Sequence, residues 1–218
     1  PAILHGLKSP HLMKPEYITI HNTANDATAR NEVAYMKRNP KSTGYHVAID
    51  DKEAIEVIPL NRNAWHAGDG GGTGNRKSIG IEICYSKSGG PKYAQAEANT
   101  IEYTAQLLKE YGWGIDRVKW HRDWSGKNCP HRILDEGRGD AFRKAVANRL
   151  DELTKPKTEV KGVSNVALKL TPGQQKAKDT LVKHGLMAKD YEINDPTILT
   201  LVTMLAPLVN KLESKGSI

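Results

Sequence analysis

Cysteine is scarce in this chain, and the scarcity limits the kinds of metal site that the sequence permits. Only Cys84 and Cys129 are present, and no CxxC pair occurs. Compact structural zinc fingers need such pairs, so that class is excluded. Two cysteines still allow a Cys84–Cys129 disulfide, two ordinary buried thiols, or one thiolate ligand in a metal site of another kind.

Several other signals are also missing. No segment approaches the ~18 to 20 continuous apolar residues of a membrane span, so we expect none. Residues 1–12 lack a basic start followed by an apolar core, so we expect no signal peptide. The glycine-rich loop at 61–77 contains neither GxGxxG nor a GxxxxGKS or GxxxxGKT run after a strand, which argues against a phosphate cradle. No basic stripe is interleaved with aromatic residues, so no nucleic-acid partner is expected.

The overall amino-acid composition is typical of a globular protein. The 218 residues are 38% hydrophobic and 26% charged, which fits one good core with a small appendage. The net charge of +7 favours an anionic partner, such as a nucleic acid, a membrane face or an anionic cell-wall polymer. A charge count by itself does not choose among these partners.

Hydrophobic periodicity predicts alternating strands and helices through residue 153. Alternating β-branched residues indicate strands, and apolar residues at helical spacing indicate helices. The sum is an α/β fold with a mixed central β-sheet flanked by helices. The expected strands are 16–21, 45–49 and 54–58 as an antiparallel hairpin, 78–85 and 117–121; the expected helices run to 38 from a cap at Asn25 or Asp26, over 93–111 and over 140–153.

The stretch from Lys119 to Pro130 carries the residues most suited to metal chemistry. It contains His121 and Cys129, and a predicted strand ends at His21. A thiolate and two imidazoles suit Zn²⁺, and three protein ligands would leave a fourth position open for water. The spacing of His121 and Cys129 is weak evidence when taken alone, so the disulfide and the buried thiols remain alternatives.

Glu82 is an unexpected residue in its strand. Ile79, Ile81 and Ile83 are predicted to share one face, while Glu82 and Cys84 share the other. An unpaired carboxylate buried in a strand costs several kcal/mol. Glu82 is therefore expected to be paired, solvated in a cleft, or functional.

Five motifs in order resemble the zinc-dependent N-acetylmuramoyl-L-alanine amidases of the type-2 group, which includes phage endolysins and peptidoglycan recognition proteins. The likeness covers roughly residues 14 to 153 and is strongest to the amidase endolysins of Bacillus phages and prophages. The motifs are Ile20-His21-Asn22-Thr23, Gly44-Tyr45-His46, Ala64-Trp65-His66-Ala67-Gly68, Asn75 with Ser78-Ile79-Gly80-Ile81-Glu82, and Trp120-His121-Arg122-Asp123 with Lys127-Asn128-Cys129-Pro130.

The resemblance implies a role for each matching residue. Its zinc ligands fall on His21, His121 and Cys129, the set that ligand chemistry also favours. Its catalytic carboxylate falls on Glu82, its lysine on Lys127, and a tyrosine that some relatives use on Tyr45. We expect Glu82 to take a proton from the attacking water and Lys127 to stabilise the oxyanion.

The remaining histidines of the motifs are assigned to the substrate cleft. Trp65, His66 and His46 are the expected substrate-binding residues, as the Trp65-His66 region lines the cleft in relatives. His46 is favoured as a packed or hydrogen-bonded histidine over a fourth metal ligand, because a full ligand shell would block the water.

The composition changes after the last predicted helix. Residues 156–218 contain no Arg and no Trp, and their nine Lys and six acidic residues supply +3 of the net charge. We predict a catalytic domain at 1–153, a linker at 154–162, and a small, mainly helical C-terminal domain at 163–218. Helix starts are expected at Thr171-Pro172 and Asp195-Pro196.

The last predicted helix carries a broad apolar stripe that needs a partner. The options are packing between the two C-terminal helices, docking on the first domain, or self-association. The resemblance implies that such a C-terminal domain binds the cell wall, and an anionic cell-wall polymer is the candidate ligand. The stripe comprises Ile198, Leu201, Val202, Leu205, Leu208, Val209 and Leu212.

The sequence therefore predicts a Zn²⁺-dependent peptidoglycan hydrolase that cuts the amide bond between N-acetylmuramic acid and L-Ala. A phage or prophage endolysin, held in the host cytoplasm until its release to the cell wall, is the expected setting. A bacterial autolysin with the same chemistry and a non-catalytic peptidoglycan-recognition module are the alternatives. The presence of Cys129 argues against the non-catalytic module.

Overall fold

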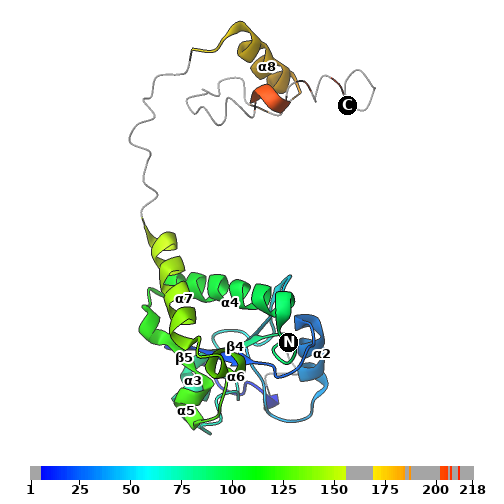
Figure 1. Cartoon of the computed structure of the whole chain (residues 1–218). Coiled ribbons are helices and arrows are strands. Elements are labelled where there is room, and N and C mark those ends of the chain that lie inside the picture. Colours follow the sequence, from blue (N-terminus) through cyan, green and yellow to red (C-terminus); the bar gives the residue numbers. More distant parts are fainter. Residues whose placement is uncertain are drawn as a thin grey trace. The chain divides into compact units, whose positions relative to one another are not determined.

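The computed structural model describes residues 6–155, 169–184, 187, 202–205, 207 and 211 of the chain. The chain divides into two compact units, Pro1–Lys155 and Pro156–Ile218, which are considered separately (Figure 1).

A five-stranded mixed sheet lies at the centre of the first unit. Its strands are β1 (Tyr17–Asn22), β2 (Val47–Ile49), β3 (Ala54–Glu56), β4 (Ser78–Ile83) and β5 (Val118–Trp120). They are arranged in the order β3-β2-β4-β1-β5. β2, β4, β1 and β5 run parallel, and only β3 is antiparallel to its neighbour. The carboxyl ends of four strands therefore meet at one edge, where ligand sites of α/β sheets form.

Helices flank this sheet. The long helix α4 packs against α7 and against β4, and α2 packs against β2 and β3 (Figure 1). The bounds are α2 (Ala29–Arg38), α3 (Thr73–Lys77), α4 (Gly90–Tyr111), the 3-10 helix η1 (Ile115–Arg117), α5 (His121–Ser125), α6 (His131–Asp135) and α7 (Gly139–Thr154). The predicted fold class, a mixed sheet flanked by helices, is confirmed.

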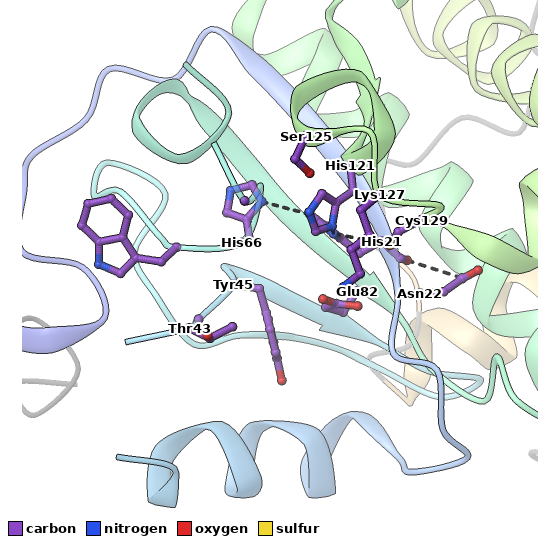
Figure 2. A pocket seen from close by; sticks show the side chains of 13 residues that line it. His21, Asn22, Thr43, Tyr45, His66, Glu82, His121, Ser125, Lys127 and Cys129 are labelled. Carbon is purple, nitrogen blue, oxygen red and sulfur yellow. Dashed lines mark hydrogen bonds between the residues drawn. The ribbon is translucent and has the colours of Figure 1, made fainter. Parts of the chain in front are cut away.

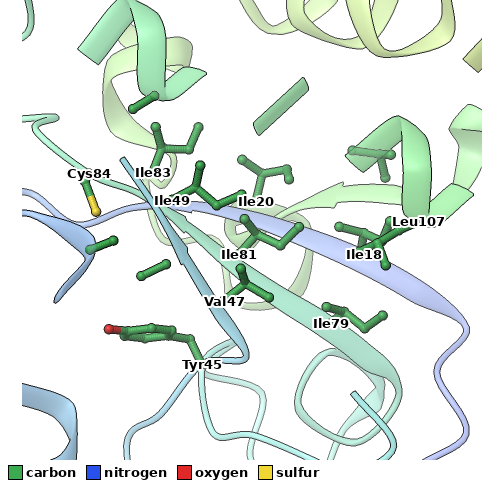
Figure 3. Close-up of a cluster of buried hydrophobic side chains, with 14 of the residues drawn as sticks. Ile18, Ile20, Tyr45, Val47, Ile49, Ile79, Ile81, Ile83, Cys84 and Leu107 are labelled. Atoms are coloured by element: carbon green, nitrogen blue, oxygen red, sulfur yellow. The ribbon is translucent and has the colours of Figure 1, made fainter. Parts of the chain in front are cut away.

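Isoleucine side chains from neighbouring strands form the core. Ile18 and Ile20 of β1 and Ile79 and Ile81 of β4 are fully buried (Figure 3). Full burial of each such side chain contributes about 1.5 to 3 kcal/mol relative to exposure. This packing holds β1 and β4 in register and so fixes the relative positions of the polar residues at their ends.

The structure differs from the sequence prediction at the short elements. The cap of α2 is Thr28, whose hydroxyl accepts from the Asn31 N–H, and not Asn25 or Asp26. The predicted loop at 61–77 ends in helix α3, and the segment after β5 begins with helix α5. Helices of five residues are too short to show an apolar period in the sequence.

In the second unit, α8 (Pro172–Lys183) begins as predicted. Thr171 and Gln174 form a reciprocal capping box with proline in the first turn. Ala177 and Leu181 of α8 pack with Val202 in a small apolar cluster. Most of the predicted linker and most of the last predicted helix lie outside the described residues, although Thr154 is the last residue of α7.

No helix within the described ranges combines the length and apolar character that crossing a membrane requires.

Candidate metal centre

The ends of β1, β4 and β5 bring together the side chains that could bind a metal ion. His21 of β1 lies in register with Glu82 of β4. His121 directly follows β5 as the first residue of α5. The loop after α5 returns Cys129 to the same place, so the three side chains converge at the carboxyl edge of the sheet (Figure 2).

Short local interactions turn the chain between His121 and Cys129. The Asp123 carboxylate accepts from the Trp120 N–H at 2.9 Å and starts α5. Gly126 ends the helix in the left-handed conformation, with φ of 76°, which glycine adopts at little cost. The Arg122 N–H then donates to the Cys129 carbonyl at 3.2 Å, which ties the returning segment to α5.

The distances between the donor atoms fit a tetrahedral zinc ion. His21 Nδ1 lies 3.1 Å from His121 Nδ1 and 3.7 Å from Cys129 Sγ. All three donor atoms lie within 4.8 Å of one another. Zinc bound at ~2.05 Å to nitrogen and ~2.3 Å to sulfur would space its donors about 3.3 to 3.6 Å apart. The residues present therefore fit this metal in both donor type and spacing.

The electrostatic environment keeps the two imidazoles neutral. Burial lowers the pKa of His121 to about 4 and lowers the pKa of His21 well below its ordinary value, and the nearby Lys127 adds to both effects. Neutral imidazole is the form that binds a metal ion.

Cys129 is a free thiol, as is Cys84, so the two do not form a disulfide. Burial and the charge of Glu82 raise the pKa of Cys129 to about 12, while the Asn22 backbone N–H lowers it by donating to the sulfur. A bound cation would be needed to keep this sulfur as a thiolate at neutral pH.

Glu82 and Lys127 both line the cavity beside these donors. Burial and the charge of Glu32 raise the pKa of Glu82 to about 8, and Lys127 lowers it. The Glu82 Oε2 atom is buried and has no hydrogen-bond partner among the described residues. Such an atom is available to a ligand in the cavity, and a bound dication would favour its ionised form. Lys127 is exposed at the cavity wall.

Tyr45 lies at the cavity but directs its hydroxyl elsewhere. The phenol ring points away from the imidazoles and toward α2 (Figure 2). Its hydroxyl is buried and has no hydrogen-bond partner within the described part of the chain, and burial together with Glu82 and Glu32 raises its pKa. In this conformation the hydroxyl does not face His21, His121 and Cys129, and the catalytic role expected for Tyr45 stays a prediction.

The three predicted substrate residues occupy different places. Trp65 is half-buried at the cavity wall, where its indole N–H donates to the Leu7 carbonyl at 3.2 Å. His66 is 7% exposed and lies against His21, with His21 Nε2 2.9 Å from His66 Nδ1. His66 therefore lines the cavity while its Nδ1 contacts His21, one of the three candidate metal ligands.

His46 is not among the described residues that line the cavity, and its expected substrate-binding role stays a prediction. His46 is fully buried. Its Nδ1 accepts from the Gly80 N–H and its Nε2 donates to the Arg62 carbonyl, both at 2.8 Å. Both ring nitrogens are thus used by the backbone, and the residue holds β4 beside the loop at 62.

The cavity has a volume of about 330 Å³. Sequence reasoning did not assign several of its walls, although Asn22, Gly44 and Gly68 lie within the quoted motifs beside residues that were assigned. The residues that line it without having been predicted as site residues are Asn22, Thr43, Gly44, Gly68 and Ser125.

Several solved structures are similar to this chain in fold and in sequence. The structure of PlyL aligns with a TM-score of 0.66 and 54% identity, covering 67% of this chain and 92% of that chain. A mutant endolysin from Bacillus subtilis aligns with a TM-score of 0.59 and 43% identity, covering 64% and 91%. Fold and site together therefore define an amidase catalytic domain of the type-2 group.

Sequence comparison gives the family. Residues 11–132 match the family model described as N-acetylmuramoyl-L-alanine amidase, and the chain belongs to this family. The N-acetylmuramoyl-L-alanine amidase XlyB of Bacillus subtilis strain 168 is 65% identical over 148 residues. The match covers 67% of this chain and 47% of XlyB, so the chain spans about half the length of that relative.

Proposed function

We propose that this protein is a zinc-dependent hydrolase of peptidoglycan that cleaves the amide bond between the lactyl group of N-acetylmuramic acid and L-Ala. The observation that carries the proposal is the convergence of His21, His121 and Cys129 beside the buried carboxylate of Glu82. Membership in the amidase family supports the choice of bond.

His21, His121 and Cys129 would hold the zinc ion through two nitrogens and one sulfur. Zinc, when bound, supplies a Lewis acid that polarises a carbonyl and lowers the pKa of water. The high-pKa carboxylate of Glu82 is suited to accept a proton from the attacking water. Glu82 then returns this proton to the leaving nitrogen, so the products are a lactyl carboxylate and the free amine of L-Ala.

Lys127 would stabilise the negative charge that develops on the carbonyl oxygen. It lines the same cavity, and its charge already lowers the pKa of Glu82, His21 and His121. Preorganised charge of this kind is worth about 3 to 4 kcal/mol in other acyl-transfer enzymes. Because a thiolate ligand weakens the Lewis acid, additional positive charge is useful here.

The proposed setting is lysis of a bacterial host by an endolysin, which the similarity to the Bacillus subtilis endolysin supports. The protein would stay in the host cytoplasm until its release to the wall. The second unit, which is rich in lysine, would contact an anionic cell-wall polymer.

The test is incubation of the full chain with purified cell walls, followed by measurement of newly exposed amino groups. We expect release of L-Ala amino termini that stops with a chelator and returns with added Zn²⁺. Tight binding to the walls without amine release would instead identify a non-catalytic recognition module. Amine release that is insensitive to the chelator would contradict the role of zinc.

A further inference from the structure

The ring of His66 lies between a backbone carbonyl and His21, one of the candidate metal ligands. Its Nε2 lies 3.2 Å from the carbonyl oxygen of Ser78, and its Nδ1 lies 2.9 Å from Nε2 of His21. The rings of His66 and His21 meet edge to face, with centroids 5.0 Å apart. Figure 2 shows His66 beside His21, with the contact between the two rings marked by a dashed line.

These two contacts define where the protons sit. A carbonyl oxygen only accepts, so the Nε2 of His66 carries the hydrogen. His66 is buried, and neither of its ring partners, the Ser78 carbonyl and the His21 imidazole, carries a negative charge, so the ring is neutral and its Nδ1 is an acceptor. Nε2 of His21 must then carry a hydrogen and donate it to His66. This leaves the lone pair of His21 Nδ1 directed toward His121 and Cys129.

Ala67, the residue after His66, orients the second imidazole, that of His121, in a similar way. The Ala67 backbone hydrogen-bonds to the His121 ring, and His121 Nε2 lies beside Gly68, 3.3 Å from the position that a Cβ would take there. With Nε2 donating to Ala67, the Nδ1 of His121 also keeps a free lone pair. The two Nδ1 atoms lie 3.1 Å apart, so a cation placed between them would be bound by both lone pairs.

The segment that carries His66 and Ala67 is itself fixed from α3. The Asn75 side-chain oxygen accepts from the N–H groups of both His66 and Ala67, each at 2.7 Å. On the other side, the His66 ring rests on Gly80 of β4, where a Cβ would lie only 2.8 Å from its Cγ. The ring therefore has little freedom to rotate.

We propose that His66, held in place by Asn75, is a positioning residue that sets the tautomer of His21 and thereby presents its Nδ1 to the metal. The proposal rests on the proposed function in that it takes His21 as a zinc ligand. It assigns His66 a role different from the substrate contact predicted from the sequence. Hydrogen-bond partners of metal-ligating histidines typically change metal affinity by about 10- to 100-fold.

The first test measures zinc affinity by competition with a chromogenic chelator. His66→Leu removes the acceptor and should raise the zinc dissociation constant about 10- to 100-fold. His66→Asn is the matched control, because its side-chain oxygen takes the place of Nδ1, and its affinity should lie much closer to the unsubstituted chain. Equal affinities for His66→Leu and the unsubstituted chain would overturn the proposal while leaving the zinc site intact.

The second test reads the tautomer directly in the full chain without zinc. Long-range ¹⁵N–¹H NMR correlations of the imidazoles should show His21 as the Nε2–H tautomer, with a shift toward the Nδ1–H form in His66→Leu. If His66→Leu does not fold, the spectrum of the unsubstituted chain decides, because an Nδ1–H tautomer at His21 would overturn the proposal. Failure to bind zinc together with an Nε2–H tautomer would contradict the proposed function but not this inference.

Discussion

At the scale of single residues, Glu82 is the group whose environment is most suited to moving protons. Its Oε2 atom is buried with no hydrogen-bond partner in the part of the chain that the structure describes, and burial raises its pKa to about 8. Glu82→Gln keeps the size of the side chain but removes the base. We expect the variant to bind zinc normally while amine release from cell walls falls about 10²- to 10⁴-fold.

The control for this prediction is Glu16→Gln, which removes a carboxylate that pairs with Lys77 at the surface, 2.9 Å away. Its activity should match that of the unsubstituted chain. Undiminished amine release by Glu82→Gln would remove Glu82 from the mechanism.

Gly80 provides a second prediction at this scale. An added methyl group would lie 2.8 Å from Cγ and Nδ1 of His66, so the ring must shift. We expect Gly80→Ala to cost about 1 to 3 kcal/mol of stability and to weaken zinc binding in the same direction as His66→Leu. Chelator competition and thermal unfolding measure the two effects. Unchanged zinc affinity in a folded Gly80→Ala protein would show that the His66 ring can move without consequence.

At the scale of elements, helix α2 carries a buried carboxylate, that of Glu32, whose charge lowers the stability of the fold. Glu32 is 9% exposed, and burial raises its pKa, although Asn25 lowers it by donating to the carboxylate. A carboxyl group whose pKa is higher in the folded state binds its proton more tightly there. Stability is therefore lost as the pH rises through the folded-state pKa.

At pH values above that folded-state pKa, Glu32→Gln should accordingly raise the unfolding temperature. Glutamine can still accept a hydrogen bond from Asn25. The gain should disappear at acidic pH, where Glu32 is protonated in both states. Thermal unfolding of the two proteins at pH 8 and at acidic pH measures this difference. A gain that is the same at both values would show that the charge of Glu32 is not its cause.

The segment before β1 supports one wall of the cavity. Lys8 is 3% exposed, and its ammonium donates to the carbonyls of Lys41 and Thr43, the latter at 2.9 Å. Its stem crosses Gly44, where a Cβ would lie 3.3 Å from the Lys8 Cβ. The segment thus connects the residues before β2 to the loop that carries Trp65.

Lys8→Met keeps the length of the stem but leaves two carbonyls without their donor, at a cost of about 1 to 3 kcal/mol. Because Thr43 and Gly44 line the cavity, we expect KM for peptidoglycan fragments to rise while zinc affinity stays constant. The exposed Lys14→Met is the matched control. A drop in zinc affinity in Lys8→Met would indicate a wider disturbance of the site.

The sequence predicted the long elements well and the short ones poorly. Helices α4 and α7 repeat apolar residues over several turns, so their periods are visible. Helices α3, α5 and α6 have five residues each, and their positions depend on local contacts such as that between Asp123 and Trp120. The pairing order of the strands also depends on long-range packing that a periodic pattern does not contain.

At the scale of the whole molecule, the sequence predicted which side chains would gather as candidate metal ligands but not how their neighbours are directed. His21, His121 and Cys129 meet as their chemistry suggested. The directions of Tyr45 and His66, by contrast, depend on packing against α2 and β4, and one sequence contains no record of those contacts.

All the residues of this centre lie within the first compact unit, whereas +3 of the net charge of +7 belongs to residues 156–218. The second unit is therefore not expected to contribute to metal binding.

The central claim is that two imidazoles and one sulfur of this unit bind a single zinc ion. X-ray absorption at the zinc edge of the full chain, loaded with one equivalent of Zn²⁺, measures these ligands directly. The account predicts sulfur at ~2.3 Å and nitrogen at ~2.0 to 2.1 Å, with the sulfur signal lost in Cys129→Ser. A first shell without sulfur in the unsubstituted chain, or a sulfur signal that survives Cys129→Ser, would contradict it.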